Sequence, residues 1–260
     1  MSSLTPHDQD LPLMVHLIEL RDRLVISIVA TVICIFVAFA YVEPLWDFLV
    51  APLNDALKAT EHGTMATIDV FEGIITQLKV SVLGGVLLAS PVVFYQIWQF
   101  IYPALTKEEA KWILPLSLSS SLLFFAGVTF GYSIIFRYLF PFALEISGKD
   151  VPAMLSINSY LMTATKLLLA FGVSFQLPVG AFVLSKIGLV DHKDLLGFFR
   201  YAIVIILIVS AILTPPDPLS QLLMAMPLTI LYGISIGIAF IFSTKERLEE
   251  QEDTTALTPQ

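Results

Sequence analysis

The stretch HLIELRDRL, at positions 16–24, sets a carboxylate between leucines and two guanidinium groups directly before a long uncharged run. Arg21 and Arg23 are explained as topology signals, because basic residues are retained on the cytoplasmic side of a membrane. Glu19 is not explained in that way. If the stretch is helical, Glu19 can form an ion pair with Arg23 one turn away, which is worth roughly 0.2–0.5 kcal/mol.

A second carboxylate with possible chemistry lies in FIYPALTKEEAKW, residues 100–112. Thr106 is followed three residues later by Glu109, which is the spacing of a capping box, in which the glutamate reaches back to the amide of the cap residue. A capping carboxylate that faces water keeps unused lone pairs, so Glu109 can also accept a guanidinium. The sequence leaves both roles open.

Three further polar residues lie within or beside apolar runs. Gln176 lies mid-run next to Pro178, so it can bond the carbonyl that the proline leaves without a donor, a neighbouring helix, or the membrane helix of a partner. Asp217 directly precedes Pro218, an order typical of a helix N-cap followed by proline at the first helical position. Gln221 follows one turn later in the same motif, TPPDPLSQ.

Residue patterns for other chemistry are missing from the sequence. It contains no HExxH and no phosphate-binding glycine loop, and no carboxylate lies in the middle of an apolar run, which disfavours metalloproteases, nucleotide-binding enzymes and ion pumps. The four histidines show no metal-ligand spacing, and the single cysteine, Cys34, allows neither a disulfide framework nor a thiolate cluster. We therefore expect no catalytic residue, no metal, no cofactor and no nucleic-acid partner.

These side chains must be positioned by membrane helices. Of the 260 residues, 57% are hydrophobic and 14% are charged, and the mean hydropathy is +0.83, well above that of a water-soluble domain. A helix that rises about 1.5 Å per residue needs roughly 20 apolar residues to cross the hydrocarbon core of a bilayer. Six segments reach or approach this length: 24–42, 76–101, 113–139, 160–186, 196–213 and 219–242.

Basic residues set the expected orientation, since they collect on the cytoplasmic side. If the N-terminus is cytoplasmic, that side holds Arg21, Arg23, Lys107, Lys111, Lys186, Lys193, Arg200, Lys245 and Arg247. The outer loops then hold only Lys58 and Lys149. Both termini are therefore expected in the cytoplasm.

The sequence thus predicts an all-α integral membrane protein with a single six-span domain over residues 1–242. Residues 12–23 are expected to form an amphipathic helix that lies in the membrane interface, and residues 243–260 an acidic, disordered tail. Prolines in several spans predict bent helices and a cup-shaped bundle. The long outer loop, about 43–75, is expected to fold into a small cap with short helices.

Four motifs in order carry a resemblance to a known family: HLIELRDRL, SPVVFYQIWQFIYPALTKEE, FGVSFQLPVG and LTPPDPLSQLLMAMP. With them the chain, from about residue 12 to 242, resembles the TatC family, the multi-spanning receptor subunit of the twin-arginine protein translocase. The resemblance implies a protein of the cytoplasmic (inner) membrane that binds the twin-arginine signal peptides of folded proteins. It also implies an oligomeric complex with the single-span subunits TatA and TatB, driven by the proton-motive force.

The resemblance also implies roles for individual residues. The signal-peptide site corresponds to Glu19, Glu109, Arg21, Arg23, Phe100 and Pro103. Two carboxylates can distinguish paired arginines from paired lysines, because the planar guanidinium pairs bidentately, and the two arginines of the first motif are expected to orient Glu19. The region of Asp217 and Gln221 is implied in docking partner helices. Gln176 stands where many members have a glutamate, so the resemblance implies for it a hydrogen bond to a partner helix and not a role that needs charge.

Two other classes of protein fit the sequence less well. A secondary transporter of a small solute is the main alternative, but it predicts a polar midplane site with broken helices, for which only Gln176 beside Pro178 gives any sign. A membrane-embedded enzyme needs a nucleophile and a base within the spans, and no such pair is present in the apolar runs.

Overall fold

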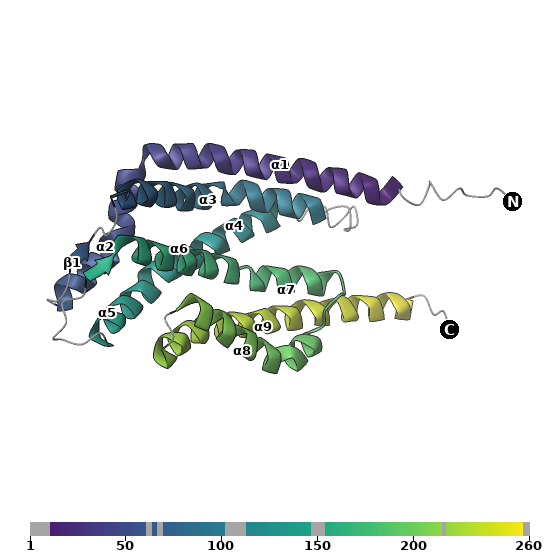
Figure 1. Ribbon diagram of the computed structural model, residues 1–260. Coiled ribbons are helices and arrows are strands. Elements are labelled where there is room, and N and C mark those ends of the chain that lie inside the picture. The colour runs from purple at the N-terminus through teal and green to yellow at the C-terminus, as the bar shows by residue number, and fades with distance from the viewer. Residues whose placement is uncertain are drawn as a thin grey trace. The chain divides into compact units, whose positions relative to one another are not determined.

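The computed structural model of the chain describes residues 11–60, 64–66, 70–101, 113–146, 154–214 and 217–256 (Figure 1). These residues form two compact units. One combines the chain up to Trp46 with Gln77–Ser121, and the other combines Asp47–Thr76 with the chain from Leu122 onward. Within the described part, six stretches are long and apolar enough to cross a membrane: His16–Ala40, Glu72–Ile101, Ile113–Glu145, Ile157–Lys186, His192–Leu213 and Pro218–Phe242. The predicted all-α, six-span fold is confirmed.

The first unit is built on helices α1 (Leu11–Ala40) and α3 (Glu72–Ile101). The two backbones approach closely at Gly85, where an added Cβ would lie 2.6 Å from the Cα of Ile35. No residue with a side chain fits at this position without displacing the α1 backbone. Glycine at position 85 therefore allows α1 to pack directly on α3.

Helix α1 differs from its expectation, because it is one uninterrupted helix of 30 residues. Residues 12–23 therefore belong to the same helix as the first span, and their predicted place in the membrane interface stays a prediction. The physical reason is local: no proline or glycine lies between Pro12 and Pro44, so nothing interrupts the backbone hydrogen bonds of the helix where the charged motif meets the apolar run.

Helix α4 (Ile113–Phe130) is joined to α3 within the first unit by a buried polar contact. The indole Nε1 of Trp98 donates to the hydroxyl of Ser120 at 2.8 Å, and Ser120 is fully buried. A buried indole N–H needs such an acceptor, because leaving it without one costs the desolvation of the group. This contact ties α4 to the half of α3 that carries the candidate site described below.

Most of α2 (Val42–Thr60), the helix expected in the first outer loop, belongs to the second unit, which begins at Asp47. The third span continues from α4 through the π-helical turn η4 (Gly131–Ile135) into α5 (Phe136–Ile146), and the fourth begins with α6 (Ile157–Ser174). Tyr132 and Tyr160, from these two spans, donate at 2.6 Å to the consecutive carbonyls of Phe48 and Leu49 in α2. The two hydroxyls fix α2 to the spans of its unit.

A small parallel sheet in the second unit was not expected. Strand β1 (Thr64–Ala66) pairs with β2 (Met154–Ser156), three residues each. Next to it the buried carboxylate of Glu72 accepts the hydroxyl of Ser156 at 3.2 Å and the amide of Asn158 at 2.8 Å. Glu72 therefore helps to satisfy the free amides at the start of α6, which the α-helix itself cannot bond.

Three more helices complete the second unit. The fourth span resumes as α7 (Leu177–Lys186), and α8 (His192–Leu213) and α9 (Pro218–Ala256) follow it. Helix α9 packs on both α7 and α8 (Figure 1). Phe182 contacts Phe242 edge to face, and the hydroxyl of Tyr232 donates to the carbonyl of Leu195 at 2.9 Å.

The acidic tail also differs from its expectation. Residues 243–256 continue α9 instead of forming a disordered segment, so the prediction of disorder is wrong for this part, and 257–260 lie outside the described residues. The segment TKERLEEQED is rich in lysine, arginine, leucine, glutamate and glutamine, which are strong helix formers, and contains no helix breaker. High charge alone did not outweigh this propensity next to an established helix.

Candidate functional site

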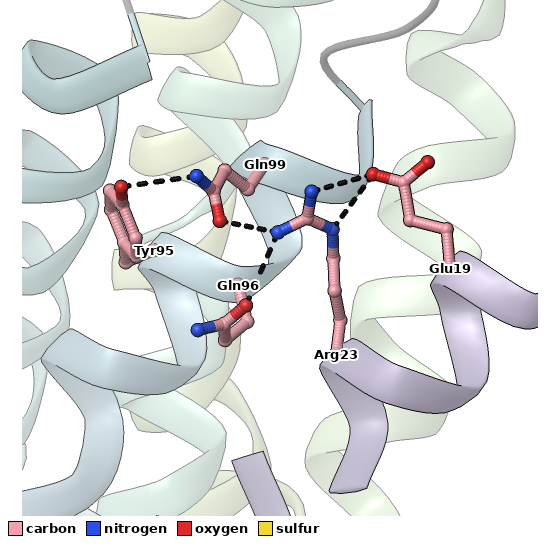
Figure 2. Close-up of polar contacts among 5 residues, drawn as sticks. All are labelled: Glu19, Arg23, Tyr95, Gln96 and Gln99. Atoms are coloured by element: carbon pink, nitrogen blue, oxygen red, sulfur yellow. Dashed lines mark hydrogen bonds and ion pairs between the residues drawn. The ribbon is translucent and has the colours of Figure 1, made fainter. Parts of the chain in front are cut away.

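The candidate site is centred on the ion pair between Glu19 and Arg23, near the start of the first span in α1. The Nε and Nη2 groups of Arg23 both donate to one oxygen of Glu19, Oε1, at 3.1 and 2.5 Å (Figure 2). The predicted pairing of residues i and i+4 is therefore confirmed. The side chains are partly buried, with 28% of Glu19 and 20% of Arg23 exposed, so water screens the pair less than it would a surface pair.

Helix α3 supplies the other acceptors of the Arg23 guanidinium. Its Nη1 donates to the amide oxygen of Gln96 at 3.4 Å and to that of Gln99, and the amide nitrogen of Gln99 donates to the Tyr95 hydroxyl at 3.1 Å (Figure 2). Gln96 is buried, and Gln99 lies one turn further along the same helix. Arg23 is thus fixed between α1 and α3 within the first unit.

The two oxygens of Glu19 differ in what they bind. Oε1 accepts two N–H groups from Arg23, whereas no residue in the described ranges donates to Oε2. Figure 2 shows Oε2 pointing away from the guanidinium. An ionised carboxylate has about four lone-pair positions, so Oε2 retains capacity for a further donor. The arrangement can therefore accept a second cationic or polar donor without displacing Arg23.

Arg21 does not orient Glu19 by pairing with it. Its Nε and Nη2 bind Asp22 at 2.9 and 2.7 Å, and both side chains are well exposed. On a helix, positions 19 and 21 are about 200° apart, so they point to opposite sides, whereas positions 19 and 23 share a face. The expectation that both arginines orient Glu19 is therefore met by Arg23 and corrected for Arg21.

Phe100 directly follows Gln99, which binds Arg23, and it contacts α1 in space. Its ring stacks on the imidazole of His16, with centroids 4.5 Å apart and planes 19° apart. This contact places the end of α3 beside the same part of α1 that carries Glu19. Pro103 and Glu109, the other two site residues expected in the segment 100–112, lie outside the described residues.

The residues expected to contact partner helices lie in the second unit and make contacts of their own. Asp217 is the predicted N-cap: its carboxylate accepts the amide of Ser220 at 2.7 Å, and α9 begins at Pro218. The side-chain amide of Gln221 donates to the carbonyl of Leu207 in α8 at 3.0 Å. Gln176 lies between α6 and α7, where the fourth span is interrupted just before Pro178, and its carbonyl accepts the amide of Gly180 at 2.9 Å.

Sequence reasoning missed Gln96, Gln99 and Tyr95. A usable signal was present in FYQIWQF, where two amides three residues apart interrupt the end of an apolar span. Residues i and i+3 share a helix face, so such a pair predicts a polar partner on a neighbouring helix. As for metals, no group of three His, Cys, Asp or Glu side chains lies together within the ranges that the structure describes.

Comparisons with known proteins agree with this description. The family model described as Sec-independent protein translocase protein (TatC) matches residues 15–227. A protein from Desulforapulum autotrophicum named Sec-independent protein translocase protein TatC is 41% identical over 249 residues, which cover 96% of this chain and 92% of the relative. One from Helicobacter pylori with the same name is 39% identical over 225 residues, covering 86% and 85%.

Solved structures are similar as well. A crystal structure of the twin-arginine translocase receptor TatC matches with a TM-score of 0.78 at 38% identity, covering 86% of this chain and 97% of that one. A second structure of the receptor, in DDM, gives a TM-score of 0.79 at 37% identity and covers 86% and 99%. The similarity therefore extends over most of the described helices.

Proposed function

Because this chain belongs to the TatC family and is a multi-pass membrane component of the Sec-independent protein translocase, we propose that it is the subunit that binds twin-arginine signal peptides. The peptides of folded proteins dock at the cytoplasmic face of the inner membrane, where both termini of this chain also lie. The protein binds and recruits, and it catalyses no reaction. A small-solute transporter is set aside, since the family is one of protein translocases.

The observation that carries the proposal is the state of Glu19. One carboxylate oxygen is held by Arg23 and the other has no donor from the described residues, so the group is both oriented and open. A guanidinium of the signal peptide can donate to Oε2 through two N–H groups. A lysine ammonium is a compact, strongly hydrated point charge, and it must lose part of its hydration shell to bind there. The site thereby favours arginine over lysine.

A second carboxylate is needed to attract two positive charges. The Glu19–Arg23 pair is formally neutral, so it attracts a dication only weakly at a distance. Glu109 follows α3 by eight residues and supplies a further negative charge for the second arginine of the peptide. Phe100, at the end of α3, and Pro103, which follows that helix in the sequence, complete the proposed peptide site together with Arg21.

The proposal is tested by peptide binding to the purified protein. We expect an Arg-Arg peptide to bind more tightly than its Lys-Lys counterpart, and we expect Glu19→Gln and Glu109→Gln each to erase that preference. Asp22→Asn is the matched control, because it removes an exposed carboxylate of the same helix whose ion-pair partner among the described residues is Arg21 and not Arg23. A preference that survives both glutamate substitutions, or that is lost equally in the control, would contradict the assignment.

We propose further that the single-span subunits TatA and TatB dock on the second unit, at Gln176, Asp217 and Gln221. These groups are only partly buried, so each offers polar atoms near lipid, where a partner helix gains from a hydrogen bond. A photo-crosslinking residue at 221 should capture a partner subunit in membranes, whereas one at Ile230, which is exposed on the same helix, should capture less. Equal capture at both positions would argue against this docking site.

A further inference from the structure

Arg23 does not adopt the strongest geometry open to an arginine beside a carboxylate. A guanidinium pairs best when two parallel N–H groups reach the two oxygens of the carboxylate. Here Nε and Nη2 converge on Oε1 of Glu19 alone, and Oε2 stays free of Arg23 (Figure 2). Some other contact must therefore hold the guanidinium back from the second oxygen.

The contact that does so comes from α3. Nη1 of Arg23 is turned toward that helix and donates to the amide oxygens of Gln96 and Gln99. Four of the five N–H groups of the guanidinium are then used. A shift of the guanidinium onto both oxygens of Glu19 would break the bonds made by Nη1.

Gln99 is itself held in one orientation. Arginine has no acceptor, so only the amide oxygen of Gln99 can face it, and the amide nitrogen then faces the Tyr95 hydroxyl, to which it donates at 3.1 Å. Turning the amide over would set two donors against each other. Tyr95, which is 37% exposed, thus supports Gln99 from outside the ion pair.

We propose that Gln99 is a positioning residue that keeps Oε2 of Glu19 open for a guanidinium brought by a ligand. Without its amide oxygen, Arg23 moves onto both oxygens of Glu19 and closes the site from within. The inference rests on the proposed function, because it names what makes the peptide site selective. It also predicts a property of Arg23 that can be observed with no peptide present.

The first test measures the affinity for an Arg-Arg peptide. We expect Gln99→Leu, which keeps the size of the side chain but removes the acceptor, to weaken binding about tenfold, the effect of one charge-assisted hydrogen bond. Gln99→Glu restores an acceptor and should bind within about threefold of the native protein. Gln77→Leu is the matched control, because it makes the same change on the exposed part of the same helix and should leave the affinity unchanged.

A double substitution separates positioning from general loss of structure. In an Arg23→Lys background, an ammonium cannot bridge the two carboxylate oxygens as a guanidinium does. Adding Gln99→Leu to this background should therefore change the affinity by less than about twofold. An unchanged or higher affinity in the single Gln99→Leu variant, or an equal loss in both backgrounds, would overturn the inference.

The second test needs no peptide and distinguishes the failure of this inference from that of the proposed function. In protein labelled with ¹⁵N in its arginines, the Arg23 Nε–H signal is assigned by its loss in Arg23→Lys. This hydrogen donates to Oε1 alone in the native protein. We expect its chemical shift to change in Gln99→Leu and to return in Gln99→Glu. If the native protein binds no peptide, the proposed function fails, while an unchanged Nε–H signal in Gln99→Leu overturns the positioning role.

Discussion

The hydroxyl of Tyr132 donates to the backbone carbonyl of Phe48 at 2.6 Å, and the two rings stack with their centroids 4.3 Å apart. Phe48 is the residue four positions before Pro52, which lies inside α2. Proline has no N–H, so the carbonyl of Phe48 lacks its usual helical donor. Tyr132 supplies that donor from another span of the same unit.

Removing the Tyr132 hydroxyl should therefore destabilise the protein through this carbonyl. We expect Tyr132→Phe to lower the free energy of unfolding by about 1 kcal/mol, since it removes one hydrogen bond and keeps the stacked ring. In a Pro52→Ala background the helix regains its own donor, and the same substitution should cost less. Thermal unfolding in detergent of the four proteins of this cycle measures the difference, and equal costs in both backgrounds would show that Pro52 is not the cause.

Gly85→Ala should disturb the packing of α1 on α3. The added Cβ would lie 2.6 Å from backbone atoms of Ile35, which cannot move aside as a flexible side chain can. We expect a loss of about 1–3 kcal/mol, typical of overpacking. Gly73→Ala is the control on the same helix, because nothing lies within 4 Å of its added Cβ. Its stability should be unchanged or slightly higher, as helix propensity favours alanine.

Asp217→Ala should shorten or weaken the start of α9. The carboxylate accepts the amide of Ser220 at 2.7 Å, and loss of such a cap costs about 1 kcal/mol. Asp217→Asn keeps a good N-cap and should remain close to the native stability. If crosslinking to TatA or TatB falls in the asparagine variant as well, the charge of Asp217 has a role in docking beyond its role as a cap.

Ser120→Ala should cost more than its small size suggests. It leaves the Trp98 indole N–H without the acceptor seen at 2.8 Å, at the position of a fully buried serine, which costs about 1–3 kcal/mol. Ser119→Ala is the neighbouring control, because among the described residues the Ser119 hydroxyl donates to the carbonyl of Leu116 in its own helix, at 3.0 Å, and to no other helix. A melting temperature lowered equally by both changes would contradict the special cost at Ser120.

Features set by local chemistry were predictable from the sequence. The six spans followed from length and hydropathy, the Glu19–Arg23 pair from helical spacing, and the cap at Asp217 from the proline after it. Each depends on residues within a few turns of one another. In the motif HLIELRDRL, the contact between Glu19 and Arg23 within one helix was therefore predicted correctly.

Features that join distant segments were not predictable. Gln96 and Gln99 gain their meaning from Arg23, more than 70 residues earlier, and β1 pairs with a strand about 90 residues later. At residues 12–23 and 243–256 the difference between expectation and structure has another cause. In both places a change from apolar to charged sequence was read as a structural boundary, although helix propensity continues across it.

The uninterrupted course of α1 makes it a stiff rod of roughly 45 Å. Glu19 and Arg23 lie toward one end, and Ile35, which meets Gly85, lies toward the other. A helix with no kink does not bend sharply between these two points. A force applied at the ion pair therefore rotates α1 as a rigid body about its contact with α3. If a signal peptide binds Glu19 as proposed, a pull on this residue is therefore transmitted along the whole of α1 to the contact between Ile35 and Gly85.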